Sequence, residues 1–197
     1  MELPIFPLNG AVLFPGTSLP LNIFEKRYVE MVNYALARDR YIGMIQADKN
    51  DKLYNIGCVG KIHSFNETND GRYLISLHGT NCFKLIKELD QSYNFRLVEA
   101  QLIDNNENIG KLNDKHRKEL LKKYESYIKM NNINIALDDL DKIDLPQIIK
   151  FIAMVSPFKN EDKQVLVETN NIDDFYDKLL SIIELELKAD FTSKTIN

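Results

Sequence analysis

The fold is decided by three neighbouring stretches: Leu-Pro-Ile-Phe-Pro-Leu (residues 3–8), Val-Leu-Phe-Pro-Gly (12–16) and Leu-Pro-Leu-Asn-Ile-Phe-Glu-Lys-Arg-Tyr (19–28). Four of the protein's six prolines fall here, and nearly every residue between them is apolar. Each proline fixes its own φ and pushes the preceding residue toward extended backbone, so no helix can run through the stretch. It therefore predicts short, buried, extended segments joined by tight corners, one of them at Pro15-Gly16.

The hydrophobic period changes directly after this stretch. Apolar residues then stand at the i, i+3, i+4 and i+7 positions that share one face of a helix, namely Tyr28, Met31, Val32 and Ala35. Asn22 followed by Glu25 has the spacing of a capping box, which predicts a helix start near Ile23.

Residues 1–105 are expected to form a curled, β-rich domain. Strand-like runs occupy 41–47, 56–65, 72–77, 83–86 and 93–103, with Gly79 as an interruption. Asn69-Asp70-Gly71 is a strong turn signal between two of these runs. The polar run from Asp104 to Gly110 is the candidate domain boundary.

Residues 106–197 are expected to form a helical bundle, which makes the fold class α+β. The predicted apolar stripes are Leu120, Tyr124, Tyr127 and Ile128; Leu145, Ile148, Ile149 and Ile152; and Ile172, Phe175, Tyr176, Leu179, Ile183 and Leu187. Asp144 before Leu145-Pro146 is typical of a helix start, and Asn160 and Asn171 are further candidate caps.

The composition excludes few classes of function. A net charge of −4 gives no overall attraction to nucleic acid, and two cysteines, Cys58 and Cys82, suit a reducing compartment. The N-terminus does not read as a signal peptide, and no run approaches the roughly 20 apolar residues of a membrane span. The expectation is a cytoplasmic protein without a membrane partner.

The chain begins with a proline-rich extended stretch, the proline ribbon (residues 3–20), which contains the Pro15-Gly16 corner and is followed by an amphipathic helix. This order resembles the N-terminal substrate-binding domain of Lon-type proteases. Asp70-Gly71-Arg72-Tyr73, Leu145-Pro146 and Lys163-Gln164 extend the resemblance through nearly the whole chain. It implies a PUA-like β-domain followed by helices, in a freestanding form without the ATPase and peptidase domains. Cys82 departs from the pattern, because many relatives carry an arginine before the phenylalanine.

No catalytic residue is assigned. The nearest approach to a phosphate-binding loop is Gly57-Cys58-Val59-Gly60-Lys61-Ile62, whose glycine spacing is wrong and which lacks the hydroxyl that binds magnesium. Cys58, His63, His78 and Cys82 would suit zinc if their strands were neighbours, but they lack a short cysteine knuckle, and buried apolar cysteines are favoured. The sequence therefore predicts a non-enzyme without metal or cofactor.

A locally basic segment, residues 111–129, has two interpretations: an RNA-binding face, or a solvated helix face. Because no aromatic stacking pattern accompanies the basic residues, the solvated face is favoured.

The preferred hypothesis is a non-catalytic module that binds exposed apolar or unfolded polypeptide segments, as an adaptor for a protease or as an independent recognition protein. An apolar surface beside a sheet edge suits an extended peptide. The candidate peptide-binding residues near exposed corners are Phe14, Pro15, Leu19 and Tyr28.

Overall fold

The structure is a computed structural model that describes residues 1–104, 110–135, 140 and 143–195. The chain divides into two compact units. The β-rich unit comprises Met1–Asn105 and Pro157–Glu168, and the helical unit comprises Asn106–Ser156 and Thr169–Asn197. The segment 157–168, expected in the helical half, thus groups with the strands.

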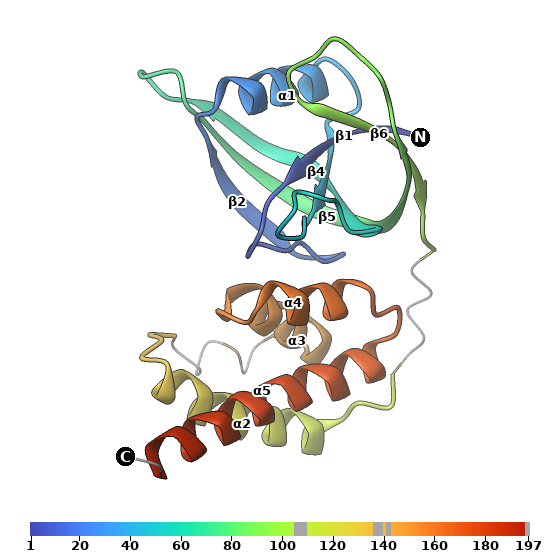
Figure 1. Ribbon diagram of the computed structural model, residues 1–197. Coiled ribbons are helices and arrows are strands. Elements are labelled where there is room, and N and C mark those ends of the chain that lie inside the picture. The colour runs from blue at the N-terminus through green and yellow to red at the C-terminus, as the bar shows by residue number, and fades with distance from the viewer. Residues whose placement is uncertain (105–109, 136–139, 141–142, 196–197) are drawn as a thin grey trace. The chain divides into compact units, whose positions relative to one another are not determined.

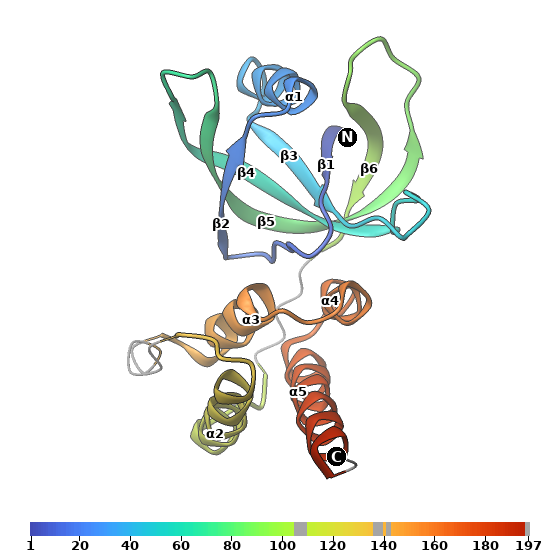
Figure 2. The ribbon, with the colours of Figure 1, turned by 60° about the vertical axis from the view of Figure 1, so that its left-hand side comes forward.

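The β-rich unit is built on one six-stranded sheet. Its elements are β1 (Glu2–Pro7), β2 (Ser18–Ile23), α1 (Lys26–Leu36), β3 (Tyr41–Ile45), β4 (Ile56–Glu67), β5 (Tyr73–Glu88), β6 (Arg96–Leu102) and α4 (Asn160–Val167). The strand order is β2-β5-β4-β3-β1-β6, and an additional β5–β6 pairing closes the curl. β1 and β3 are parallel, whereas the other pairs are antiparallel. Figures 1 and 2 show the strands curling around a common interior, with α1 across one end.

The helix α1 closes the core with the stripe that its periodicity predicts: Tyr28, Met31, Val32 and Ala35 are all buried. They pack with Phe6, Leu13, Ile42 and Leu77 from the strands and the proline ribbon. The predicted helix start near Ile23 is wrong. Asn22 and Ile23 continue β2 opposite Leu74 and Tyr73, and α1 begins at Lys26 without a side-chain cap. Pairing with β5 thus overrides the local capping signal.

The strand β5 is continuous over sixteen residues, so the predicted interruption at Gly79 does not end the strand. It appears instead as a register shift in the pairing with β4, where Val59 is opposite Asn81 and Gly60 is opposite Gly79. Its first half pairs with β2 and its second half with β6. Gly79 serves a different purpose, because a Cβ atom there would lie 2.1 Å from the carbonyl oxygen of Phe14. The missing side chain lets the Pro15-Gly16 corner pack directly on β5.

The helical unit contains α2 (Asp114–Met130), α3 (Leu145–Val155) and α5 (Ile172–Thr195). The predicted faces of α2 and α3 are buried, and the Asp144 side chain caps α3 by accepting from the Gln147 amide at 3.2 Å. The buried Ser156 hydroxyl donates to the Tyr124 hydroxyl oxygen at 3.2 Å and joins the end of α3 to α2.

Within the described residues, no helix has the length and apolar character needed to cross a membrane.

We expect the substitution Gly79→Ala to destabilise the protein by about 1–3 kcal/mol, because the new methyl group meets backbone that cannot rotate away. Urea unfolding followed by circular dichroism measures this. Ser76→Ala in the same strand is the matched control and should leave the unfolding midpoint nearly unchanged. An unchanged midpoint for Gly79→Ala would contradict the close packing of the corner on β5.

Candidate functional site

The predicted site residue Phe14 lies in the core, with only 2% of its surface exposed. Its amide donates to the Thr17 hydroxyl oxygen at 3.2 Å, and that hydroxyl donates to the Phe14 carbonyl oxygen at 2.8 Å. The corner is further tied to β5, because the Gly16 amide donates to the Gly79 carbonyl at 2.9 Å. The expectation of an exposed Phe14 is therefore corrected: a turn with satisfied hydrogen bonds turns the ring inward. Pro15 beside it is half-buried.

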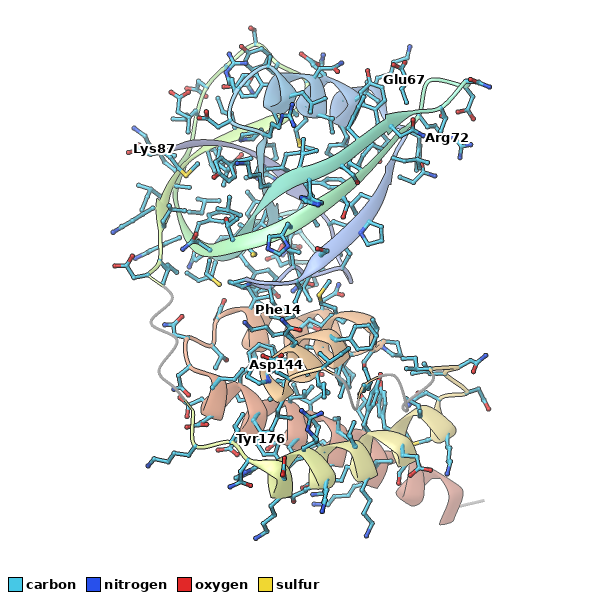
Figure 3. The ribbon with its side chains drawn as sticks, turned by 180° about the vertical axis from the view of Figure 1, so that it is seen from behind. Phe14, Glu67, Arg72, Lys87, Asp144 and Tyr176 are labelled. Atoms are coloured by element: carbon cyan, nitrogen blue, oxygen red, sulfur yellow. The ribbon has the colours of Figure 1, made fainter. Side chains whose placement is uncertain are left out.

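The other two predicted residues lie elsewhere on the β-rich unit. Leu19 is half-buried in β2 opposite Leu77, and Tyr28 is buried at the start of α1. Figure 3 shows Phe14 at the end of the β-rich unit that is remote from the hairpin turn between Glu67 and Arg72. β2 runs from the Phe14 corner toward that hairpin, so the structure does not gather all four residues in one place.

An apolar cleft of about 290 Å³ opens where β1 ends, β2 ends and α1 begins. Its lining residues are Phe6, Pro7, Leu8, Leu21, Asn22, Ile23, Phe24, Glu25, Arg27 and Tyr28. Tyr28 is the one predicted site residue in this cleft. Its ring lies 4.3 Å from that of Phe6, centroid to centroid, and burial raises the pKa of its hydroxyl, which keeps the wall neutral.

The rim of the cleft carries both signs of charge. The Arg27 guanidinium is 2.9 Å from the Glu25 carboxylate, and it also lies 4.5 Å from the centre of the Tyr28 ring. Because the two charges offset each other, the cleft has no strong preference for an anion or a cation. Its contribution to binding is the burial of apolar surface.

The edge of β2 beside this cleft offers backbone groups to a further strand. Among the described strands, β2 pairs with β5 alone. The Gly79 amide donates to the Thr17 carbonyl at 2.8 Å, so these two opposed residues form a hydrogen-bonded pair. Because the two pair types alternate along an antiparallel ladder, the next pair, Ser18 and His78, is non-hydrogen-bonded. By alternation, Ser18, Pro20 and Asn22 direct their backbone away from β5. Pro20 has no amide hydrogen to lose there, so it is tolerated at this position.

Exposed aromatic side chains stand near the end of β2, and the sequence analysis missed them. Phe24 is 68% exposed directly after the buried Ile23, and Phe65 on β4 is 42% exposed. The Phe65 ring meets that of Tyr73 edge-on at 4.9 Å, and Tyr73 pairs with Ile23. The alternation of an inward Ile23 with an outward Phe24 is a strand signal that could have identified Phe24.

Three basic residues of α2 make side-chain contacts within the helical unit, and the other lysines of the segment are exposed. Arg117 donates to the carbonyl oxygens of Leu140 and Ile143 at 3.3 and 2.8 Å. Lys123 bonds Glu184, which raises the pKa of the lysine, and Lys129 pairs with Glu125 at 2.6 Å. These contacts favour the solvated-face interpretation over an RNA surface.

Candidate metal ligands do not gather in the described part of the chain, where no three His, Cys, Asp or Glu side chains cluster. His63 and His78 are both exposed, and the His78 ring bonds the Ser18 hydroxyl at 3.2 Å. Cys58 and Cys82 are buried and face each other across β4 and β5.

Buried polar side chains attach α4 to the strands. The Gln164 amide donates to the Ile56 carbonyl at 3.1 Å, and the Gln46 amide donates to the Gln164 side-chain oxygen at 3.2 Å. The Lys163 ammonium donates to the Gly10 carbonyl at 2.7 Å, and burial lowers the pKa of this lysine. These contacts are structural, and they explain why α4 groups with the sheet.

Comparisons with known proteins match this chain over nearly its full length. The family model described as the ATP-dependent protease La (LON) substrate-binding domain matches residues 2–184. The Lon protease of Buchnera aphidicola subsp. Acyrthosiphon pisum is 26% identical over 198 residues, covering 95% of this chain and 25% of the relative. That of Escherichia coli strain K12 is 24% identical over 202 residues, with the same coverage. The chain thus spans about a quarter of the length of these relatives.

Solved structures show the same fold. The crystal structure of a Lon N-terminal domain protein from Xanthomonas campestris aligns with a TM-score of 0.68 at 20% identity, covering 92% of this chain and 98% of that one. The N-terminal domain of Mycobacterium avium complex Lon protease aligns with a TM-score of 0.67 at 15% identity, covering 93% and 98%. The predicted α+β class is confirmed by these neighbours.

We expect Phe14→Ala to lower the free energy of unfolding by about 3–5 kcal/mol, because removing a buried aromatic ring leaves a cavity. Phe24→Ala is the matched control, since its ring is mostly in solvent, and it should leave stability near wild type. Urea unfolding of both variants measures the difference. Wild-type stability in Phe14→Ala would show that the ring lies outside the core.

Proposed function

The chain belongs to the family of ATP-dependent protease La (LON) substrate-binding domains, and from that premise we propose that it is a non-catalytic module for exposed apolar or unfolded polypeptide segments. The observation that carries the proposal is the apolar cleft beside the outward-facing edge of β2. An extended segment pairs its backbone with Ser18 and Asn22 and places an apolar side chain in the cleft.

The chemistry of the cleft supports promiscuous rather than sequence-specific binding. Backbone pairing makes no demand on side-chain identity, and the opposed Glu25 and Arg27 charges select no sign of ligand charge. Phe24 at the rim adds a large exposed apolar surface that contact with a peptide would cover. Together these features favour unfolded chains, in which backbone and apolar side chains are accessible at once.

We further propose that the module acts as an adaptor that presents captured segments to a protease in the cytoplasm. Family membership supports this role, because the relatives named above are Lon proteases whose corresponding region is a small part of their length. The two thiols support a reducing compartment.

Peptide binding is tested with Phe24→Ser, measured by fluorescence anisotropy of a labelled, reduced and carboxymethylated α-lactalbumin. Loss of a large apolar contact should weaken the affinity about tenfold or more, with no shift in the thermal midpoint. Leu185→Ser is the matched control, because Leu185 on α5 is 66% exposed and lies in the other unit. Equal affinity of the two variants would remove the cleft from the binding site.

The same assay separates strand pairing from other modes of binding. A probe peptide with N-methylated amides at alternate residues should bind more weakly than its unmethylated counterpart, because it cannot pair with the β2 edge. Affinity should change little as salt rises, since apolar burial and backbone pairing carry it. A steep decline with salt, together with binding to RNA, would instead support a phosphate-binding function.

We expect the purified chain neither to hydrolyse ATP nor to cleave casein, because its sequence holds no phosphate-binding loop of the required spacing. Phosphate release and casein gel assays measure the two activities. A contaminating enzyme is the obvious source of a false signal. Activity that purifies with the protein and disappears in a point variant of this chain would contradict the prediction.

A further inference from the structure

The two cysteines of the protein stand directly opposite each other in the sheet. Cys58 on β4 and Cys82 on β5 are register partners in an antiparallel pair. Directly opposed residues in an antiparallel pair carry their side chains on the same face. The two thiols are therefore neighbours, although 23 residues separate them between Cys58 and Cys82 in the sequence.

Two backbone hydrogen bonds fix the type of this pair. The Leu85 amide donates to the Asn55 carbonyl at 2.8 Å, so these two opposed residues form a hydrogen-bonded pair. The adjacent pair, Ile56 and Lys84, is therefore non-hydrogen-bonded. By alternation, the pair two residues along, Cys58 and Cys82, is of the same type. The Ile103 amide independently donates to the Cys82 carbonyl at 2.9 Å, so this carbonyl points to the β6 side, away from β4.

The geometry of such a pair suits a disulfide. In non-hydrogen-bonded pairs the Cα atoms lie about 4.5 Å apart and the side chains approach closely. That separation falls within the range of about 4.4–6.8 Å that disulfides span. A bond between Cys58 and Cys82 therefore requires side-chain rotation and little movement of the backbone.

Both cysteines lie close to the C-terminal part of α4. The Cys82 Sγ is 3.9 Å from the Val167 carbonyl oxygen. Cys58 lines a cavity of about 10 Å³ together with Gln164 and Val167, which is about the space of one water molecule. Cys58 is 1% exposed and Cys82 is 8% exposed, so Cys82 is the more accessible of the two thiols.

We propose that Cys58 and Cys82 form a redox modification site whose oxidant is a hydroperoxide, and that α4 controls access to it. The Cys82 thiolate attacks a peroxide oxygen, the O–O bond breaks, and the oxygen remains on sulfur as a sulfenic acid while water or an alcohol leaves. The Cys58 thiolate then attacks the Cys82 sulfur and expels hydroxide, which is protonated to water. The two sulfurs lose two electrons in total, the peroxide gains them, and added dithiol reverses the reaction.

The test uses the full chain, treated with hydrogen peroxide under native conditions and then denatured in iodoacetamide. Intact mass spectrometry should show wild type lighter by two hydrogens and without alkylation, and dithiothreitol should restore both alkylation sites. A non-reducing gel should show monomer. In Cys58→Ala, Cys82 lacks its partner and should progress to the sulfinic acid instead.

Control by α4 is tested with Gln164→Ala, which removes the hydrogen bonds to Ile56 and Gln46. The population of the opened helix should rise, and oxidation should run about tenfold faster than in wild type. Glu161→Gln, an exposed change on the same helix, is the matched control and should oxidise at the wild-type rate. Equal rates in Gln164→Ala and wild type would overturn the role of α4.

The disulfide itself is tested by wild type alone and needs no variant to fold. Two alkylation sites remaining after peroxide treatment of wild type would overturn the site. Disulfide-linked dimers, or a sulfinic acid on wild-type Cys82 with Cys58 still alkylated, would overturn it as well.

Discussion

The β-rich unit depends on the contact between the Phe14 carbonyl and Gly79. Only glycine allows the corner at 14–17 to lie this close to β5, because a Cβ atom at position 79 would lie 2.1 Å from the Phe14 carbonyl oxygen, far inside van der Waals contact. The two Gly79 backbone hydrogen bonds, from the Gly16 amide and to the Thr17 carbonyl, then set the register in which β2 leaves the corner. That register determines which backbone groups of β2 face outward, so the proposed binding edge is a consequence of one absent side chain.

The sequence predicted those features that depend on local periodicity. The α1 stripe from Tyr28 to Ala35 and the Asp144 cap of α3 were predicted correctly. Both features depend only on residues that are close together in the sequence. The exposure of Phe14 was mispredicted, because a Pro-Gly pair indicates a corner without indicating what packs against it. The Asn22–Glu25 capping signal was likewise overridden, because Asn22 and Ile23 pair with Leu74 and Tyr73 of β5.

The candidate site was harder to predict than the fold, for a physical reason. The cleft forms where the end of β1, the end of β2 and the start of α1 meet. The sequence of each segment by itself predicts only a buried strand, a loop or a helix start. Tyr28 was proposed because it lies near the start of the helix next to the predicted corner, and it does line this cleft. Phe24 was missed because the capping signal predicted a helix start near Ile23, which hid the strand alternation of an inward Ile23 and an outward Phe24. The cysteine pair needed the strand register, which sequence spacing does not reveal.

The β-rich unit is not contiguous in the chain, because α4 belongs to it while residues 106–156 belong to the other unit. A fragment ending near residue 105 would lack Gln164, leaving the buried Gln46 and the Ile56 carbonyl without those hydrogen bonds. Neither unit can therefore be transplanted as one uninterrupted stretch of coding sequence. A cut near residue 105 would therefore divide one packed unit, whereas the chain order alone would place the boundary between two.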